Sequence, residues 1–213
     1  MRRLAGFVGI ALAAFALAPA PAQEIQHQAI LQDSLSAIAP FAAVSGQTPG
    51  RAQMPGGEAA APSGYLAFCD RNPGECRTHR GQPDRIALND ESWAMLEKVN
   101  IAVNNMIRPV DDSEHYGVAE FWAVPVDGEG DCEDYVLAKR KMLTLLGLPP
   151  DALRITVALN RRRERHAVLT VVSDRGDYIL DNAQDDILPA QETDYRWVER
   201  QDAKSRTGWL ALN

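Results

Sequence analysis

The 213-residue sequence lacks the features that mark several specialised classes of protein. It has no excess of positive charge, because 22 lysines and arginines stand against 29 aspartates and glutamates, for a formal net charge of −7. A general nucleic-acid binder needs a basic surface to neutralise phosphates, so this balance argues against that class. The composition, 46% hydrophobic and 24% charged, argues against collagen, coiled coil and wholesale disorder.

The sequence also lacks an apolar run of the roughly 20 residues that a transmembrane helix needs. Its clearest apolar run, Leu4–Leu17, follows Arg2 and Arg3 and precedes the small-residue cleavage site Ala20-Pro21-Ala22. This order predicts a Sec-type signal peptide over residues 1–22 and a periplasmic or secreted protein. Such a compartment is oxidising and permits disulfides.

Little apolar sequence follows the predicted signal peptide. Residues 42–64 are rich in Gly, Pro, Ala, Ser and Gln, and they offer too little apolar area to offset the entropy of ordering. We therefore expect a flexible N-terminal segment and linker over 23–64 and one folded domain over 65–213.

Two helices are expected in the first half of this domain. The first spans 89–108 and is capped by Asn89 or Asp90. The second spans 131–146 and is capped by Asp131, and Lys139, Arg140 and Lys141 are expected on its solvated face. The apolar periodicity then changes to two. The strands expected from this pattern are 154–160, 166–172, 178–181, 194–200 and 207–212. Helices followed by antiparallel strands predict an α+β fold.

The three cysteines cannot all pair within one chain. Cys69 and Cys76 flank the turn-prone Asn72-Pro73-Gly74, and in an exported protein this spacing favours a local disulfide. The alternative is a pair of metal ligands, although no second Cys or His pair at zinc spacing follows. His79 stands alone and is expected at the surface.

Cys132 is then left over, and three features favour a reactive thiol over a buried inert one. It begins a predicted helix, where free N–H groups and the dipole lower a thiol pKa. It follows Gly128-Glu129-Gly130, which lets the backbone turn sharply and approach a substrate. His166, which begins one predicted strand, and Asp181, which ends the next, follow in chain order. The residues therefore suggest a Cys-His-Asp triad.

Negative charge around Cys132 opposes thiolate formation. Asp131, Glu133 and Asp134 surround the cysteine, and a hard cation such as Ca²⁺ bound to these carboxylates would neutralise them. The simpler alternative is a helix capping box formed by Asp131 and Asp134. The two interpretations are compatible.

The strand register is an obstacle to the triad. A turn centred on Arg175 would place Asp181 opposite Thr170, four residues along the strand from His166. Contact with His166 would then need a bulge or a strong bend. Otherwise another acid, such as Asp177 or Asp185, would orient the histidine.

Several motifs resemble the bacterial transglutaminase-like cysteine proteinases. They are Gly130-Asp131-Cys132-Glu133-Asp134-Tyr135, His166-Ala167-Val168-Leu169, Leu180-Asp181-Asn182, Phe68-Cys69 with Glu75-Cys76-Arg77, and the stretch from His115-Tyr116-Gly117 to Trp122. The resemblance covers the domain from about residue 65 onward. It implies a papain-like, transglutaminase-type fold, with Cys132 as nucleophile, His166 as base and Asp181 as the residue that orients it.

Within this family the sequence is similar to the LapG-like periplasmic proteases, which clip large surface adhesins and use calcium. That similarity implies Ca²⁺ ligands at Asp131, Glu133 and Asp134, a protein or peptide substrate and an inner-membrane receptor.

The sequence thus predicts a periplasmic cysteine endopeptidase. The backbone N–H of Cys132 would stabilise the oxyanion, with Trp122 or Tyr116 as candidates for a second donor, although core packing is the simpler role for both. One alternative keeps the triad for acyl transfer to an amine, as in a transglutaminase or amine acyltransferase. The other is a non-catalytic periplasmic module whose acids hold calcium.

Overall fold

The computed structural model describes residues 48–77, 79, 81–205 and 207–212. The predicted signal peptide, 1–22, and the first part of the predicted linker, 23–47, lie outside these residues. Within the described ranges, no helix is both long enough and apolar enough to cross a membrane.

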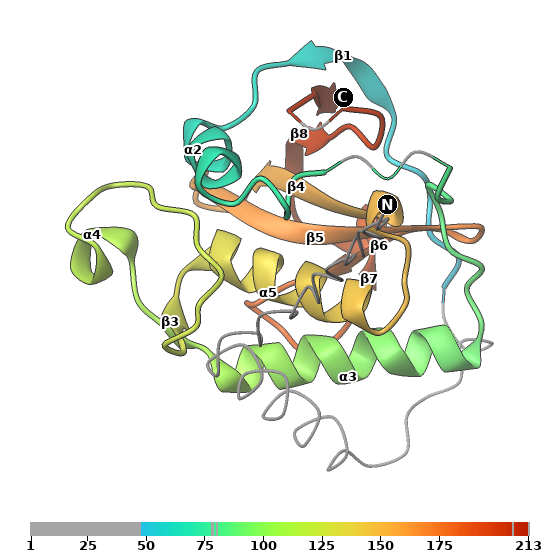
Figure 1. Ribbon diagram of the computed structural model, residues 1–213. Helices are drawn as coiled ribbons and strands as arrows, with labels where there is room; N and C mark the ends of the chain where they lie inside the picture. Colours follow the sequence, from blue (N-terminus) through green and yellow to red (C-terminus); the bar gives the residue numbers. More distant parts are fainter. Residues whose placement is uncertain (1–47, 78, 80, 206, 213) are drawn as a thin grey trace, which may run out of the picture.

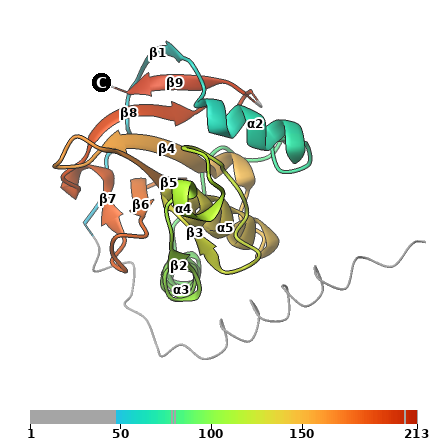
Figure 2. The same cartoon turned by 90° about the vertical axis from the view of Figure 1, so that its left-hand side faces the viewer.

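A seven-stranded antiparallel sheet forms the centre of the fold, in the order β1-β9-β8-β4-β5-β6-β7 (Figures 1 and 2). A separate two-stranded parallel pair joins β2 to β3. The bounds are β1 (Pro55–Ala59), β2 (Arg108–Pro109), β3 (Glu129–Gly130), β4 (Leu153–Leu159), β5 (Arg165–Ser173), β6 (Gly176–Leu180), β7 (Leu188–Pro189), β8 (Arg196–Gln201) and β9 (Trp209–Leu212).

In the described part of the chain four α-helices accompany the sheet, and the two longest lie on the same face of it. In Figures 1 and 2, α5 lies between α3 and the central strands. The helices are α2 (Ser63–Arg71), α3 (Asp90–Met106), α4 (Asp112–His115) and α5 (Cys132–Leu145), with two short 3₁₀ turns, η2 (Pro150–Ala152) and η3 (Ala190–Glu192). The predicted α+β class is confirmed, and each predicted strand and helix is present with shifted ends.

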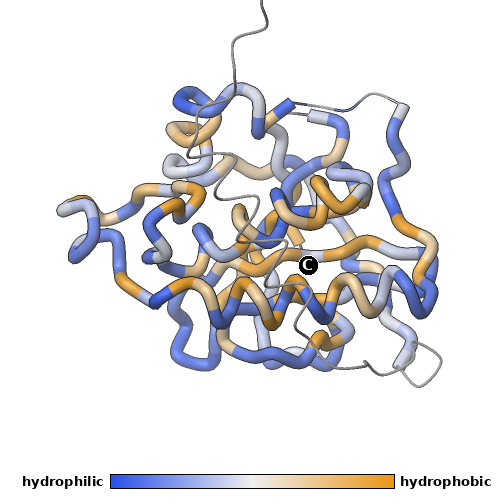
Figure 3. The backbone as a smooth tube through the Cα atoms, turned by 60° about the horizontal axis from the view of Figure 1, so that its bottom comes forward, coloured by the Kyte–Doolittle hydropathy of each residue, from blue (hydrophilic) through white to orange (hydrophobic). Residues whose placement is uncertain are grey.

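The start of α3 follows the predicted cap. The Asn89 side chain accepts a hydrogen bond from the Ser92 N–H at 2.9 Å, and the Ser92 hydroxyl accepts one from the Asn89 N–H at 2.9 Å. Seen from outside the helix, hydrophobic and hydrophilic residues alternate along α3 (Figure 3). Trp93, Leu96 and Val103 are buried on its inner face, so α3 covers the core with an amphipathic surface.

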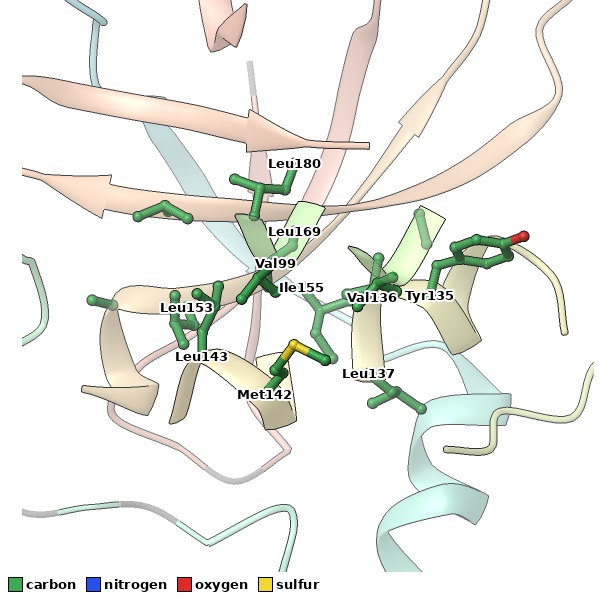
Figure 4. Packing of buried hydrophobic residues seen from close by; sticks show 14 of the residues in the cluster. Val99, Tyr135, Val136, Leu137, Met142, Leu143, Leu153, Ile155, Leu169 and Leu180 are labelled. Atoms are coloured by element: carbon green, nitrogen blue, oxygen red, sulfur yellow. The ribbon is translucent and has the colours of Figure 1, made fainter. Parts of the chain in front are cut away.

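The core lies between α5 and the sheet. Val136 and Leu143 of α5 face Leu153 and Ile155 of β4 and Leu169 of β5, and all five are buried (Figure 4). The helix ends before Gly147, whose φ of +99° is a left-handed conformation that glycine adopts without a steric penalty. Packing of Val136 and Leu143 against the sheet therefore sets the position of α5.

The solvated face predicted for α5 is wrong for two of its three residues, since only Lys141 is partly exposed. Lys139 is 1% exposed and Arg140 is 9% exposed. Arg140 donates from Nε to the Leu153 carbonyl at 3.0 Å, while burial lowers the pKa of Lys139 to about 7, an effect that Asp181 and Asp185 partly offset. A charged run on a helix indicates a solvated face only when no buried partner is available, and here the sheet and the following loop supply partners.

The ordered domain begins earlier than the predicted boundary at residue 65. The segment from 48 to 64 contains β1, which pairs with β9 and forms the edge of the sheet. Just before β1, the Gln53 N–H donates to Asp177 Oδ2 at 2.7 Å, and the Gly50 N–H donates to the Tyr178 hydroxyl at 3.2 Å. A segment poor in apolar residues is thus ordered by backbone hydrogen bonds to a distant part of the chain, which composition does not reveal.

The predicted disulfide between Cys69 and Cys76 is present, with both cysteines buried. It joins the end of α2 to the turn that follows. His79 keeps 37% of its side chain exposed and lies 3.6 Å, from Nδ1 to Oδ1, from Asp151. Because both sulfurs are in the disulfide, Cys69 and Cys76 do not act as metal ligands.

We predict that replacing both cysteines, Cys69→Ala with Cys76→Ala, lowers the free energy of unfolding by about 2–3 kcal/mol, because the short closed loop no longer restricts the unfolded chain. Guanidinium unfolding of the oxidised protein would measure the loss. A reductant should destabilise the wild type by a similar amount and leave the double variant unchanged. Equal stability of the oxidised wild type and the double variant would contradict the prediction.

Candidate active site

Cys132 is the first residue of α5, and local sequence places it there. Gly128 has a φ of +80°, which lets the chain reverse before the short strand β3. Asp131 then occupies the N-cap position with extended backbone. The N–H groups of the first helical turn have no partner inside the helix, so they point toward the space in front of Cys132.

The environment of Cys132 stabilises a protonated thiol. Burial raises the pKa of the Cys132 thiol well above its usual value, and the charges of Glu133 and Asp131 raise it further. The sulfur lies 3.1 Å from Glu133 Oε2, to which it donates. Against these effects, the Ala167 N–H donates to Sγ at 3.4 Å and favours the thiolate.

His166 and Asp181 are hydrogen bonded. His166 Nε2 lies 2.8 Å from Asp181 Oδ1, and the carboxylate is buried. The other ring nitrogen, Nδ1, is therefore the one available to a thiol. Asp177 and Asp185, the alternative acids, are engaged elsewhere, with Arg200 at 2.7 Å and Asn104 at 2.9 Å.

The bulge or bend expected between these two residues is not required. The β5–β6 register runs evenly from Ser173 opposite Gly176 to Leu169 opposite Leu180. Asp181 is therefore level with Val168, one diagonal step from His166 on the same face. The predicted register placed Asp181 opposite Thr170, two residues further from His166 than Val168, and a diagonal cross-strand contact covers the remaining separation.

Two further donors hold the Asp181 carboxylate. The Ala183 N–H donates to Oδ1 at 3.0 Å, and the Tyr195 hydroxyl donates to Oδ2 at 2.5 Å. Burial alone would raise the pKa of Asp181, but the hydrogen bonds from His166, Ala183 and Tyr195 outweigh it and hold the pKa below its usual value. Asp181 is therefore an anion that can orient His166.

Tyr195 also contacts the histidine ring. Its ring centroid lies 5.4 Å from that of His166 and 5.8 Å from that of Trp197. Tyr195 thus fixes both members of the His166–Asp181 pair, although sequence reasoning placed it only in a strand. No sequence motif marks a tyrosine at this position. Its contact with Asp181 forms only because β8 pairs with β4.

Cys132 and His166 line one cleft of about 410 Å³. Its lining includes acids such as Asp111 and Glu120, together with Arg165 and Asn160 at the β4–β5 turn. The cleft is open to solvent and polar as well as apolar, which suits an extended peptide better than a compact apolar ligand.

The two candidates for a second oxyanion donor are placed differently. Trp122 lines the cleft, is 2% exposed and donates from Nε1 to Glu120 Oε1 at 2.8 Å. A Cβ at Gly64 would lie 2.4 Å from its ring, so glycine at the start of α2 makes room for it. Tyr116 stacks on His115 and lies outside the residues that line the cleft. The structure therefore retains only Trp122 as a candidate.

A second carboxylate cluster lies behind the nucleophile. Oxygens of Asp112, Asp131 and Asp134 all lie within 4.8 Å of one another. Asp112, which sequence reasoning missed, takes the place of Glu133 in this group. Glu133 instead lies in a separate group with Asp131 and Cys132, whose ligand atoms are also within 4.8 Å of one another, and it accepts from the Cys132 thiol. The capping box is also absent, since Asp131 makes no side-chain hydrogen bond to the helix start.

This cluster has the character of a cation site. Each of its three aspartates has one buried oxygen, Oδ1 of Asp112, Oδ1 of Asp131 and Oδ2 of Asp134, that has no hydrogen-bond partner. Burial and the neighbouring acids raise the pKa of Asp134 to about 8. A Cβ at Gly130 would lie 2.5 Å from Asp134 Oδ2, so glycine leaves space for this carboxylate. Three unsatisfied oxygens fit a hard cation such as Ca²⁺.

We predict that Tyr195→Phe lowers the free energy of unfolding by about 1.5–3 kcal/mol at pH 7, because a hydrogen bond to a buried anion is lost. Asp181 has a depressed pKa in the folded state, so this contribution is present above its unfolded pKa and disappears as pH falls through the folded pKa. The deficit should therefore shrink in acid, as urea unfolding at pH 7 and below pH 4 would measure.

Tyr116→Phe is the matched control, because its hydroxyl lies outside this network. It should change stability little at either pH. A Tyr195→Phe protein as stable as the control at pH 7 would show that the hydroxyl does not hold Asp181.

Comparison with known proteins supplies the family. Residues 55–213 match the family described as bacterial transglutaminase-like cysteine proteinase BTLCP. No curated protein matches the chain. Among solved structures, the chain is similar to calcium-bound LapG of Legionella pneumophila, with 32% identity over 56% of this chain and 69% of that chain and a TM-score of 0.48. EGTA-treated LapG of the same organism is 31% identical over 57% of this chain and 68% of that chain, with a TM-score of 0.49.

The family match covers the whole sheet, both long helices and the cleft with Cys132 and His166. It starts at β1, in agreement with the ordered N-terminal strand. The chain therefore belongs to the bacterial transglutaminase-like cysteine proteinases and is a cysteine peptidase.

Proposed function

We propose that the protein is a periplasmic cysteine endopeptidase in which Cys132, His166 and Asp181 form the catalytic triad. One observation carries this proposal: the His166 Nε2–Asp181 Oδ1 hydrogen bond of 2.8 Å leaves Nδ1 free for the thiol, in a cleft that both His166 and Cys132 line. Asp181 can then orient His166, and His166 can accept the proton of the Cys132 thiol, as thiol catalysis requires.

The catalytic cycle follows from these positions. As a peptide binds, the Cys132 thiol transfers its proton to His166 Nδ1, and the sulfur attacks the peptide carbonyl carbon. The Cys132 N–H stabilises the oxyanion, and His166 gives the proton to the leaving amine as the C–N bond breaks. Water, activated by His166, then hydrolyses the thioester. The high thiol pKa favours this general-base route over a permanent thiolate.

Trp122 is proposed as the second oxyanion donor. Trp122 lines the cleft, and its Nε1 is hydrogen bonded to Glu120, which is exposed. The indole N–H would reach a substrate only after this hydrogen bond breaks. Glu120 therefore competes with the oxyanion for the same donor.

The proposal predicts that Cys132→Ala abolishes proteolysis and that Asp181→Asn lowers it about 10²- to 10⁴-fold, because His166 loses its orienting anion. The assay is digestion of a proteome-derived peptide library with identification of new termini by mass spectrometry. Asp185→Asn is the matched control and should retain most activity, since Asp185 lies on the same loop but contacts Asn104.

Other outcomes would favour the alternatives. Incorporation of a labelled amine into glutamine side chains, without new peptide termini, would indicate acyl transfer. A library left uncut by the wild type, both in Ca²⁺ and in chelator, would favour a non-catalytic module. Undiminished cleavage by Cys132→Ala would refute the proposed nucleophile.

We further propose that Asp112, Asp131 and Asp134 hold Ca²⁺. When bound, the ion would supply positive charge that offsets the carboxylates next to the nucleophile. The support is the set of three buried oxygens without hydrogen-bond partners. Glu133 is left beside Cys132, and burial together with Asp131 raises the pKa of Glu133 to about 9.

This second proposal predicts an opposite effect of Asp134→Asn with and without the ion. In chelator the variant should be at least as stable as the wild type, because a repelled buried carboxylate is removed. With Ca²⁺ at 100 times its dissociation constant, the wild type should gain about 2.7 kcal/mol and the variant far less. Thermal unfolding in EDTA and in CaCl₂ would measure both.

The stability of the protein in chelator should depend on pH with a definite sign. The pKa of Asp134 is raised to about 8, so the folded chain keeps a proton that the unfolded chain releases near pH 4. Stability in chelator should therefore fall as pH rises from about 4 to 8. Ca²⁺ should reduce this loss, and an identical pH profile with and without Ca²⁺ would contradict the site.

We also propose export by a signal peptide at residues 1–22, adhesin-type surface proteins as substrates and an inner-membrane receptor as a partner. The signal peptide is testable by N-terminal sequencing of the protein recovered from the periplasm. Substrate and receptor rest on the family resemblance alone.

A further inference from the structure

The turn between β4 and β5 concentrates positive charge beside the cleft. Residues 161–165 contain four arginines and one glutamate, for a net charge of +3 in a chain whose formal net charge is −7. All five residues are exposed. His166 follows directly, so the turn is attached to the proposed catalytic base.

The turn separates two hollows that meet at His166. Asn160, Glu164 and Arg165 line the cleft that contains Cys132. Asn160, Glu164 and two more arginines of the turn, Arg161 and Arg162, line a second hollow of about 580 Å³ on the side of Tyr195. A peptide that lies across His166 would therefore pass the turn.

Two of the arginines are already neutralised. Arg161 forms an ion pair with Asp194, and Arg165 Nη2 lies 2.6 Å from Glu199 Oε1. Arg162 and Arg163 have no carboxylate within ion-pair distance anywhere in the described part of the chain. These two guanidinium groups are available to an external anion.

The backbone holds these arginines in place. Asn160 Oδ1 accepts from the N–H of Arg162 at 2.9 Å and of Glu164 at 3.0 Å, and its Nδ2 donates to Glu164 Oε2 at 2.9 Å. Arg163 has a φ of +65°, the one positive value among the described residues other than glycine. Glycine or asparagine would fit this conformation with less strain, so an arginine here is retained at a cost to stability.

We propose that Arg162, which lines the second hollow, and its exposed neighbour Arg163, which lines neither hollow, bind carboxylate side chains of the substrate, so that the enzyme selects peptides with acidic residues on one side of the scissile bond. This inference rests on the proposed endopeptidase function. Acids such as Asp111 and Glu120 also line the cleft and would repel acidic side chains of a substrate. The preference should therefore be confined to the side of the substrate that crosses the turn, where guanidinium groups pair with carboxylates.

The experiment compares four full-length proteins on the proteome-derived peptide library, followed by kinetics on synthetic peptides that span the best cut site with Asp or Asn in the flank. Arg162→Gln with Arg163→Asn removes both charges and suits the left-handed backbone. Arg162→Lys with Arg163→Lys keeps the charge. Arg77→Gln with Arg175→Gln removes the same net charge from exposed positions outside both hollows.

We expect the wild type and the Lys double variant to cut the Asp peptide about 3- to 10-fold more efficiently than the Asn peptide, mainly through KM. The preference should be lost in the Gln/Asn double variant, retained in the distant control, and weakened by salt. Thermal unfolding checks that the variants remain folded.

The outcomes separate this inference from the function on which it rests. A library cut at many sites without an acidic preference, or a preference that survives Arg162→Gln with Arg163→Asn, would overturn the substrate inference and leave the endopeptidase intact. A library that the wild type does not cut in Ca²⁺ or in chelator would contradict the endopeptidase, and the inference with it.

Discussion

Packing of α5 against β4 and β5 determines where each reactive group lies. Val136 and Leu143 are buried against the strands, and this contact brings the first residue of the helix to the Ala167 N–H at the start of β5. The next residue toward the β4–β5 turn is His166, so one helix–strand contact sets both nucleophile and base. The His166–Asp181 pair then depends on the regular β5–β6 register.

The same packing buries charge that a helix start would normally expose. Asp134 and Lys139, five residues apart on α5, are both buried, and burial shifts their pKa values in opposite directions, to about 8 and about 7. Such groups persist where function or a bound ion compensates for the desolvation. Lys139 has Asp181 and Asp185 within electrostatic reach, whereas Asp134 has only further acids, which is why a cation fits at one end of the helix and not at the other.

Local signals predicted much of this structure. The Asn89 cap, the helix stop before Gly147 and the disulfide between Cys69 and Cys76 each depend on residues close together in the sequence. Errors arose where a distant segment decides the outcome. Lys139 is buried because a strand and a loop cover it, and β1 is ordered because β9 offers an unpaired edge.

The amino-acid sequence by itself determined the α+β class, the position of Cys132 at a helix start and the chain order of cysteine, histidine and acid, since each depends on periodicity or on neighbouring residues. Only the tertiary structure decided that Asp112 joins Asp131 and Asp134, that Tyr195 holds Asp181, and that two exposed arginines of one turn have no carboxylate partner among the described residues. These relations join residues up to 22 positions apart, as from Asp112 to Asp134, through strand pairing and packing. No local pattern encodes such contacts, because their free energy depends on which surfaces the folded chain brings together.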